Sequence, residues 1–208
     1  MALYGSENNC DNRIMSVSFC FSDIAVSEEN ETNHQHAFQF MIETERLFLK
    51  PLTLSQLEKY YRCDNSLELE LKLKTGERNI PDLVKDKLKN VIIPRVADPN
   101  KNYLFSTFWT GISKADQRMV GELCFKGEPN ARGEIELGYG TYHEFKNQGF
   151  MTEMVAAAID WARTQENVTA ILASSEKNNF PSSKVLVKNG FEINGMDDQY
   201  FHWVLQLI

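Results

Sequence analysis

The stretch Gly138–Ala162, GYGTYHEFKNQGFMTEMVAAAIDWA, determines most of what the sequence says about the fold. It starts with the pattern of a strand, passes through a polar turn at 143–149 and enters an amphipathic helix without a break. The first N–H groups of a helix lack partners within it, and the helix dipole adds partial positive charge there. Gly149 lets the backbone approach a ligand closely or take a positive φ. The junction therefore predicts an anion site suited to a pyrophosphate, with a plain helix cap as the alternative.

Apolar periodicity and turn residues predict the elements around this junction. Before it, we expect a strand over 47–51, a helix after Thr53 or Ser55, a helix or strand over 66–76, a helix opened by Pro81, and three strands over 102–112, 118–127 and 133–142. After it, we expect a helix over 152–165, a strand over 169–175, a helix over 181–189 closed by Gly190, and two final strands. The order predicts an α/β fold with one mixed, mostly antiparallel central sheet of about seven strands and helices on both faces.

The N-terminal segment differs from the rest of the 208-residue chain. Residues 1–40 hold polar runs and little apolar periodicity, so we expect an extension that is partly disordered or that adds a strand over 16–26. His34 and His36 lie in this segment without a third ligand nearby, and no metal site is predicted. Residues 41–208 are predicted to form the folded domain.

Composition excludes several classes of partner. The formal net charge is −7 and no Lys/Arg run stands out, which argues against a nucleic-acid partner. No apolar run approaches the length of a membrane span, and the four cysteines are widely spaced without a C-x-x-C pair. We therefore expect a cytoplasmic protein with no membrane or nucleic-acid partner.

A second segment makes the pattern specific. The sequence NFPSSKVLVKNGF, residues 179–191, follows ETERLFLKPLT at 43–53, EIELGYG at 134–140 and FKNQGFMTE at 145–153. With these four motifs in this order, the chain resembles the GNAT superfamily of acetyl-CoA-dependent N-acyltransferases. It is most similar to the branch that includes the ribosomal-protein Nα-acetyltransferases, over roughly residues 42–205.

The resemblance implies a GNAT-like fold in which the strand before the turn splays from its neighbour and leaves a gap for the pantetheine arm of acetyl-CoA, the co-substrate. It implies cofactor contacts for Tyr139, Gly140, Thr141, Lys146, Asn147, Gln148, Gly149, Phe150, Met151, Thr152, Asn179 and Ser182. The chain departs from the family pattern at Asn147, where glycine is common, and at Met151, where Gly or Ala is usual. The alternative role of Asn179 is to cap the N-terminus of a helix. Thr152 can either donate its hydroxyl to the ligand or cap the helix that follows the turn.

The resemblance also implies the catalytic groups. An amine must be neutral to attack a thioester carbonyl, so a base helps. Glu136 is the expected base, with a surface carboxylate as its alternative role and Glu122 as the alternative base. Many relatives carry a proton-donating tyrosine where this chain has Leu186, so Ser182 becomes the candidate donor, with a thiolate that leaves unassisted as the alternative. Cys124 is expected to be a core residue rather than an acyl carrier.

The predicted function is an acetyl-CoA-dependent N-acetyltransferase acting on a primary amine, either a small molecule or a peptide N-terminus. The acidic chain favours a cationic amine acceptor. Two alternatives remain, namely a non-catalytic acyl-CoA-binding module and a protein-interaction module whose N-terminal arm docks on a partner or on a second copy of the chain. A homodimer is compatible with each of these functions.

Overall fold

The computed structural model describes residues 40–76 and 78–207. The predicted N-terminal extension and its optional strand over 16–26 lie outside the described residues, apart from Phe40. The elements in chain order are β1 Ile42–Glu43, β2 Leu47–Pro51, α1 Leu54–Arg62, α2 Ser66–Glu70, α3 Asp82–Lys87, the π-helical turn η1 Leu88–Ile92, α4 Ile93–Ala97, the 3₁₀ turn η2 Tyr103–Phe105, β3 Trp109–Ser113, β4 Arg118–Phe125, β5 Glu134–Thr141, the 3₁₀ turn η3 His143–Phe145, α5 Phe150–Arg163, β6 Ala170–Glu176, α6 Phe180–Lys188, β7 Glu192–Met196 and β8 Tyr200–Gln206.

The strands of the described residues form one eight-stranded sheet in the order β1-β2-β3-β4-β5-β6-β8-β7. Every neighbouring pair is antiparallel except β5 and β6, which are parallel. A parallel pair needs a crossover, and helix α5 supplies it. The predicted mixed, mostly antiparallel sheet is confirmed, with one strand more than expected because the two-residue strand β1 pairs with β2.

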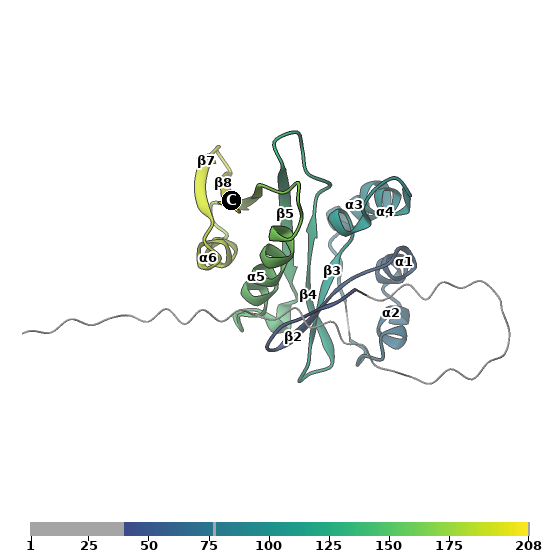
Figure 1. Ribbon diagram of the computed structural model, residues 1–208. Helices are drawn as coiled ribbons and strands as arrows, with labels where there is room; N and C mark the ends of the chain where they lie inside the picture. Colours follow the sequence, from purple (N-terminus) through teal and green to yellow (C-terminus); the bar gives the residue numbers. More distant parts are fainter. Residues whose placement is uncertain (1–39, 77, 208) are drawn as a thin grey trace, which may run out of the picture. The chain divides into compact units, whose positions relative to one another are not determined.

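Helices cover both faces of the sheet, as predicted. Helices α5 and α6 lie on one side, while α1 to α4 lie on the other (Figure 1). The α5 side holds the larger core, in which Met154, Ala158 and Trp161 pack on the sheet. On the opposite side, Leu57 and Tyr60 of α1 lie in a second core with Phe108, which precedes β3, and with the strand residues Ile112 and Met119. The sheet therefore separates two apolar layers, one under α5 and α6 and one under α1 to α4.

The helical stretch 82–97 is continuous but irregular. Its middle, Leu88–Ile92, is a π-helical turn, and Pro94 follows in the first turn of α4. Proline has no N–H for an α-helical bond, and a π-bulge accommodates such an interruption. Pro81 precedes the stretch, as predicted, and Asp82 begins α3.

The predicted strand over 102–112 is only half right. Residues 103–105 form the turn η2, because the Asn102 side chain accepts a hydrogen bond from the Leu104 N–H at 3.1 Å. The Trp109 indole donates to the Leu104 carbonyl at 2.9 Å, which holds this turn against β3. The stretch 66–76, left open between helix and strand, forms the short helix α2 and an irregular tail.

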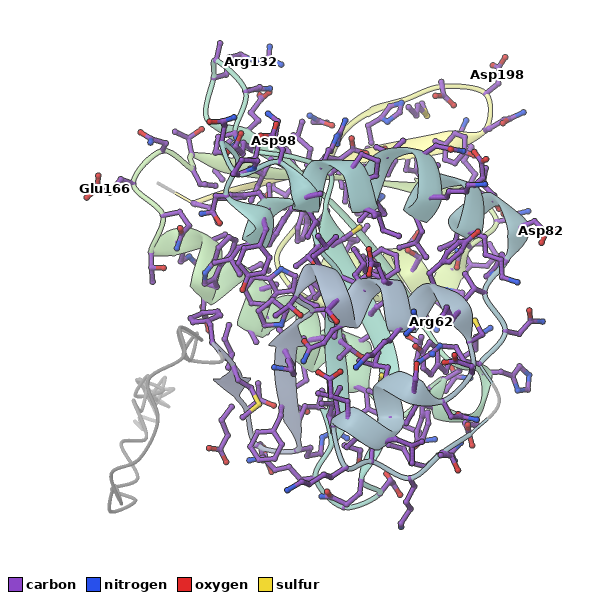
Figure 2. The ribbon with its side chains drawn as sticks, turned by 90° about the vertical axis from the view of Figure 1, so that its right-hand side faces the viewer. Arg62, Asp82, Asp98, Arg132, Glu166 and Asp198 are labelled. Carbon is purple, nitrogen blue, oxygen red and sulfur yellow. The ribbon has the colours of Figure 1, made fainter. Side chains whose placement is uncertain are left out.

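Figure 2 shows the molecule turned so that the side carrying α1 to α4 faces the viewer. The labelled side chains of Arg132, Glu166 and Asp198 project outward from loops at its edge. In the described part of the chain, no helix has both the length and the apolar character needed to cross a membrane.

Candidate functional site

Strands β5 and β6 part before β5 ends. Their parallel pairing runs from Glu134 with Ala170 to Leu137 with Ala173 and stops there, although β5 continues to Thr141. Beyond Ala173, β6 continues along β8 only. Among the described residues, the end of β5 is therefore paired on the β4 side alone. An open backbone edge results, directly before the turn into α5.

Strand alternation decides which backbone groups face this gap. In an antiparallel pair, each residue directs both its N–H and its C=O to one neighbour, and successive residues alternate. The Tyr142 N–H donates to the Val120 carbonyl of β4 at 3.0 Å, so Gly140 also faces β4. Tyr139 and Thr141 direct their backbone groups towards the gap. The predicted backbone contact thus stays a proposal for these two residues, whereas Gly140 departs from it because β4 occupies its backbone groups.

The side chain of Tyr139 reaches helix α6. Its hydroxyl lies 2.9 Å from both the carbonyl and the hydroxyl oxygen of Ser182. Burial raises the pKa of Tyr139 to about 12, so the hydroxyl keeps its proton. The sequence predicts only a backbone role for Tyr139, and this side-chain contact carries no signal in it. Leu186, in the position where relatives carry a tyrosine, is fully buried in the core and has no hydroxyl, whereas the Ser182 and Tyr139 hydroxyls lie next to each other beside the gap.

The turn 146–149 leaves the start of α5 free for an anion. Asn147 and Gly149 have φ values of 61° and 82°, both left-handed, and Asn is among the residues that tolerate this region best. Gly149 is the N-cap, and no side chain caps this helix end. The Glu153 N–H makes the first bond of the helix, 3.2 Å from the Gly149 carbonyl. The earlier N–H groups have no partner within the helix; they belong to Phe150, Met151 and Thr152.

The side chains of the turn divide into two groups. Phe150 and Met151 are buried in the core on the α5 side, so Met151 offers only its N–H to a ligand. Thr152 lies beyond the N-cap position, which excludes the capping role. Lys146 is exposed and makes no ion pair with another residue of the described ranges. A basic side chain and free N–H groups thus meet at one turn, and the Met151 side chain lies in the core rather than at the surface of the turn.

Arg46 holds this turn in place, a role that the sequence analysis did not assign. Its Nη1 donates to the Gln148 carbonyl at 2.9 Å, and its Nε to the Glu153 carboxylate at 2.7 Å. The guanidinium also stacks over the Phe150 ring, 4.6 Å from its centre. The motif ETERLFLKPLT contained this residue, but its partners are about a hundred positions away, and only the fold joins them.

Asn179 has the helix-capping role that the sequence offers as an alternative to cofactor contact. It is the N-cap of α6, and its Oδ1 accepts a hydrogen bond from the Ser182 N–H at 3.2 Å. Its amide nitrogen stays available, so a contact with a cofactor is still a proposal.

A cavity of about 890 Å³ lies on the opposite face of the sheet. The stretch 79–95 forms one wall, and the paired ends of β4 and β5 form the floor. Glu122 of β4 lies in this floor, across the ladder from Gly140. A Cβ atom at Gly140 would lie 3.5 Å from the Glu122 Oε1, so the glycine leaves the space above the carboxylate open.

Glu122 is partly buried and surrounded by polar groups. Its Oε2 is buried without a hydrogen-bond partner in the described residues. Burial raises the pKa of Glu122 to about 7, against the lowering influence of the Tyr142 and Tyr60 hydroxyls and the Arg78 guanidinium. The Tyr142 hydroxyl donates to the Tyr60 hydroxyl at 3.3 Å. A carboxylate with a pKa near neutrality can accept a proton and release it at physiological pH.

The predicted base Glu136 has a different environment. It lies outside the residues that line the cavity, its side chain is 40% exposed, and it forms an ion pair with Lys126. Glu136 is therefore a surface carboxylate, which is the alternative to its predicted role as the base. Cys124 lines the same cavity, but burial raises the pKa of its thiol to about 12, which keeps the thiol protonated and unreactive.

The raised pKa of Glu122 makes stability depend on pH. The folded protein binds this proton more tightly than the unfolded chain, so stability falls as the pH rises from about 4.5 to about 7. Glu122→Gln removes the buried charge. We expect the variant to be more stable than the wild type at pH 8 by roughly 1–3 kcal/mol, and nearly equal to it at pH 4.5.

Urea unfolding at the two pH values measures this difference. Glu136→Gln is the matched control, since an exposed ion pair contributes about 0–1 kcal/mol. A Glu122→Gln variant that is less stable than the wild type at pH 8 would contradict the raised pKa.

Comparison with known proteins agrees with this geometry. A family model described as "Acetyltransferase (GNAT) domain" matches residues 46–192. A relative from Bacillus subtilis (strain 168), described as the uncharacterized N-acetyltransferase YjdG, is 29% identical over 167 residues, which are 79% of this chain and 96% of the relative.

Solved structures share the fold. The ribosomal-protein-S5-alanine acetyltransferase from Vibrio fischeri has a TM-score of 0.60 at 16% identity, covering 81% of this chain and 97% of its own. The spermidine N-acetyltransferase from Vibrio cholerae, solved with CoA and spermine, has a TM-score of 0.55 at 14% identity, covering 79% and 97%. At these identities, the likeness concerns the fold alone.

Proposed function

The chain belongs to the GNAT acetyltransferase family, and on this premise we propose that it transfers the acetyl group of acetyl-CoA to a primary amine, either a small molecule or a peptide N-terminus. Family membership makes the chain an acetyltransferase, and therefore an enzyme rather than a non-catalytic binding module. The donor, the acceptor and the residue roles are the parts that we propose. A homodimer and the cytoplasmic location stay predictions.

The observation that carries the proposal is the parting of β5 and β6 at Leu137 and Ala173. The open edge of β5 gives an extended ligand two residues, Tyr139 and Thr141, with which to pair. At its end lies the uncapped start of α5, where Lys146 adds positive charge for phosphate groups. These features fit an elongated molecule with phosphates at one end, such as coenzyme A, and the Vibrio cholerae spermidine N-acetyltransferase was solved with CoA.

Acetyl-CoA supplies an acetyl group activated as a thioester. We propose that Glu122 accepts the proton of the acceptor amine, directly or through water, because its pKa of about 7 keeps much of it ionised at neutral pH. Gly140 keeps the space beside this carboxylate free for the amine. On the other face, Ser182 and the Tyr139 hydroxyl bonded to it hold protons that the departing thiolate can accept. The remaining contribution is positioning.

Thermal unfolding with acetyl-CoA tests the donor. A ligand that binds only the native state, at about 100 times its Kd, adds about 2.7 kcal/mol of stability. We expect a clear rise in Tm with acetyl-CoA, little with ATP, which lacks the pantetheine arm, and none with acetate. Lys146→Ala should weaken acetyl-CoA binding by up to about fivefold, because an exposed charge contributes about 1 kcal/mol or less.

The absence of a Tm shift at millimolar acetyl-CoA would overturn the proposed donor. An equal shift with ATP would show a phosphate site without recognition of the pantetheine arm, and would likewise contradict it.

A further inference from the structure

We propose that Arg78 binds a carboxylate of the acceptor, so that the acceptor is an amino acid-like molecule that carries both a primary amine and an anionic group. This inference rests on the proposed function and specifies its acceptor.

Arg78 is a buried cation with unused donors. Its side chain is 3% exposed, and it lines the cavity that has Glu122 in its floor. Its Nη1 donates to the Glu68 carboxylate at 2.8 Å, and its guanidinium stacks on the Tyr60 ring, 4.4 Å from the ring centre. Its Nε and Nη2 are buried with no hydrogen-bond partner among the described residues. The thiol of Cys63 lies beside the guanidinium but is only a weak acceptor.

The unused donors form a fork. Nε and Nη2 occupy the same edge of the guanidinium plane and donate two parallel N–H bonds, which match the two oxygens of a carboxylate. Buried donors without partners are rare and costly in native proteins. Glu68 and Tyr60 meanwhile fix the plane of the guanidinium, so the fork is positioned before a ligand arrives.

The charge of the cavity wall also favours an anion. Four basic residues line it, namely Arg78, Lys87, Arg95 and Lys126, against two acidic ones, Glu122 and Glu144. Ion pairs offset Arg78 with Glu68, Lys126 with Glu136 and Glu144 with Arg118. Among the described residues, this leaves Lys87 and Arg95 against Glu122. The net charge of −7 led us to expect a cationic acceptor. The local lining points the other way, because the charge of the whole chain does not determine the potential in one cavity.

Glu122 and Arg78 are close enough to bind one small molecule. Both neighbour Tyr60: its ring stacks under Arg78, and its hydroxyl influences the pKa of Glu122. Both residues line one cavity, and the Arg78 charge acts on the pKa of Glu122, so a short molecule can place an amine at Glu122 and a carboxylate at Arg78. Such a pair of groups suits α-amino acids and short ω-amino acids, which carry an amine and a carboxylate, rather than polyamines, which carry no anionic group.

Matched pairs of acceptors test the inference. Each pair contains an amino acid and its amide: glycine and glycinamide, β-alanine and β-alaninamide, 4-aminobutyrate and 4-aminobutanamide, glutamate and glutamine. Acetylation is measured as kcat/KM, corrected for the fraction of neutral amine. Calorimetry on the protein saturated with CoA measures acceptor binding without turnover.

In the wild type, we expect the acid of at least one pair to be preferred about 10- to 100-fold in both measurements, since hydrogen bonds to charged groups contribute about 1.5–3 kcal/mol.

Removing Arg78 alone would leave Glu68 buried and unpaired. The test therefore uses the double variant Glu68→Gln and Arg78→Met, in which the preference should fall to less than about threefold. Arg95→Met, which removes one cavity charge but not the fork, is the control and should keep most of the preference.

The outcomes separate the inference from the proposed function. Amides or spermidine that bind and react as well as the acids would overturn the inference and leave the proposed function intact. A preference for acids that survives in the double variant would overturn the role of Arg78. Acids that bind selectively through Arg78 while no amine is acetylated would support the inference and contradict the proposed function.

Discussion

Glu122→Gln is expected to lower the rate of acetyl transfer by about 10²- to 10⁴-fold at pH 7, the usual contribution of a general base. Glutamine fills the same space across from Gly140 but cannot accept a proton. The wild-type kcat/KM should rise with pH and level off above about 7, where Glu122 is ionised. In the variant, the rise of kcat/KM up to pH 7 should disappear, and the remaining rate should follow the ionisation of the amine itself.

The control for this prediction is Glu136→Gln. Glu136 shares the sheet face with Glu134 and lies outside the cavity lining, so its loss should change kcat/KM by less than about threefold, as for an exposed ion pair. Both variants should bind acetyl-CoA like the wild type in the thermal unfolding measurement. A large loss in Glu136→Gln together with an active Glu122→Gln would reverse the two assignments and restore the original prediction from the sequence.

The elements governed by local chemistry were predictable from the sequence. The strand–turn–helix junction follows from a glycine at 149 and the apolar periodicity after it, and the structure begins α5 at Phe150. Thr53 caps α1 with Gln56 in a capping box, and Gly190 ends α6 with a φ of 80°. In each case, a few neighbouring residues determine the conformation, so a single sequence suffices.

The acceptor side of the site was not predictable, because its contacts join distant segments. Alternation along β5 places Glu134 and Glu136 on one face but does not say what covers them. The choice of Glu122 over Glu136 depends on the wall formed by residues 79–95, and on Lys126, which pairs with Glu136 at the surface. Arg78 carried no signal in the sequence, since its surroundings of Glu68 and Tyr60 come from two different helices and appear only after packing.

Gly140→Val is expected to lower kcat/KM by about 10²-fold, a loss comparable to that caused by misplacing a reacting group by about 1 Å. A Cβ at this position lies 3.5 Å from the Glu122 Oε1, and the two further methyl groups of valine would occupy the space that we assign to the amine. The fold should tolerate the change, because Gly140 has no positive φ and valine favours strands. Acetyl-CoA binding should persist, since the backbone of Gly140 faces β4 rather than the gap.

Gly138→Val provides the matched control. Gly138 lies two residues earlier on the same strand face, where a Cβ would meet the Lys126 side chain at 3.6 Å and the Cys124 sulfur at 3.9 Å. Both variants add the same bulk to the same strand, so they should cost similar stability, while only Gly140→Val places it beside Glu122. Steady-state kinetics with a saturating amine, together with urea unfolding, separates the two effects. Equal losses of activity in both variants would mean that the amine does not approach over Gly140, and the position of the reacting amine beside Glu122 would have to be abandoned.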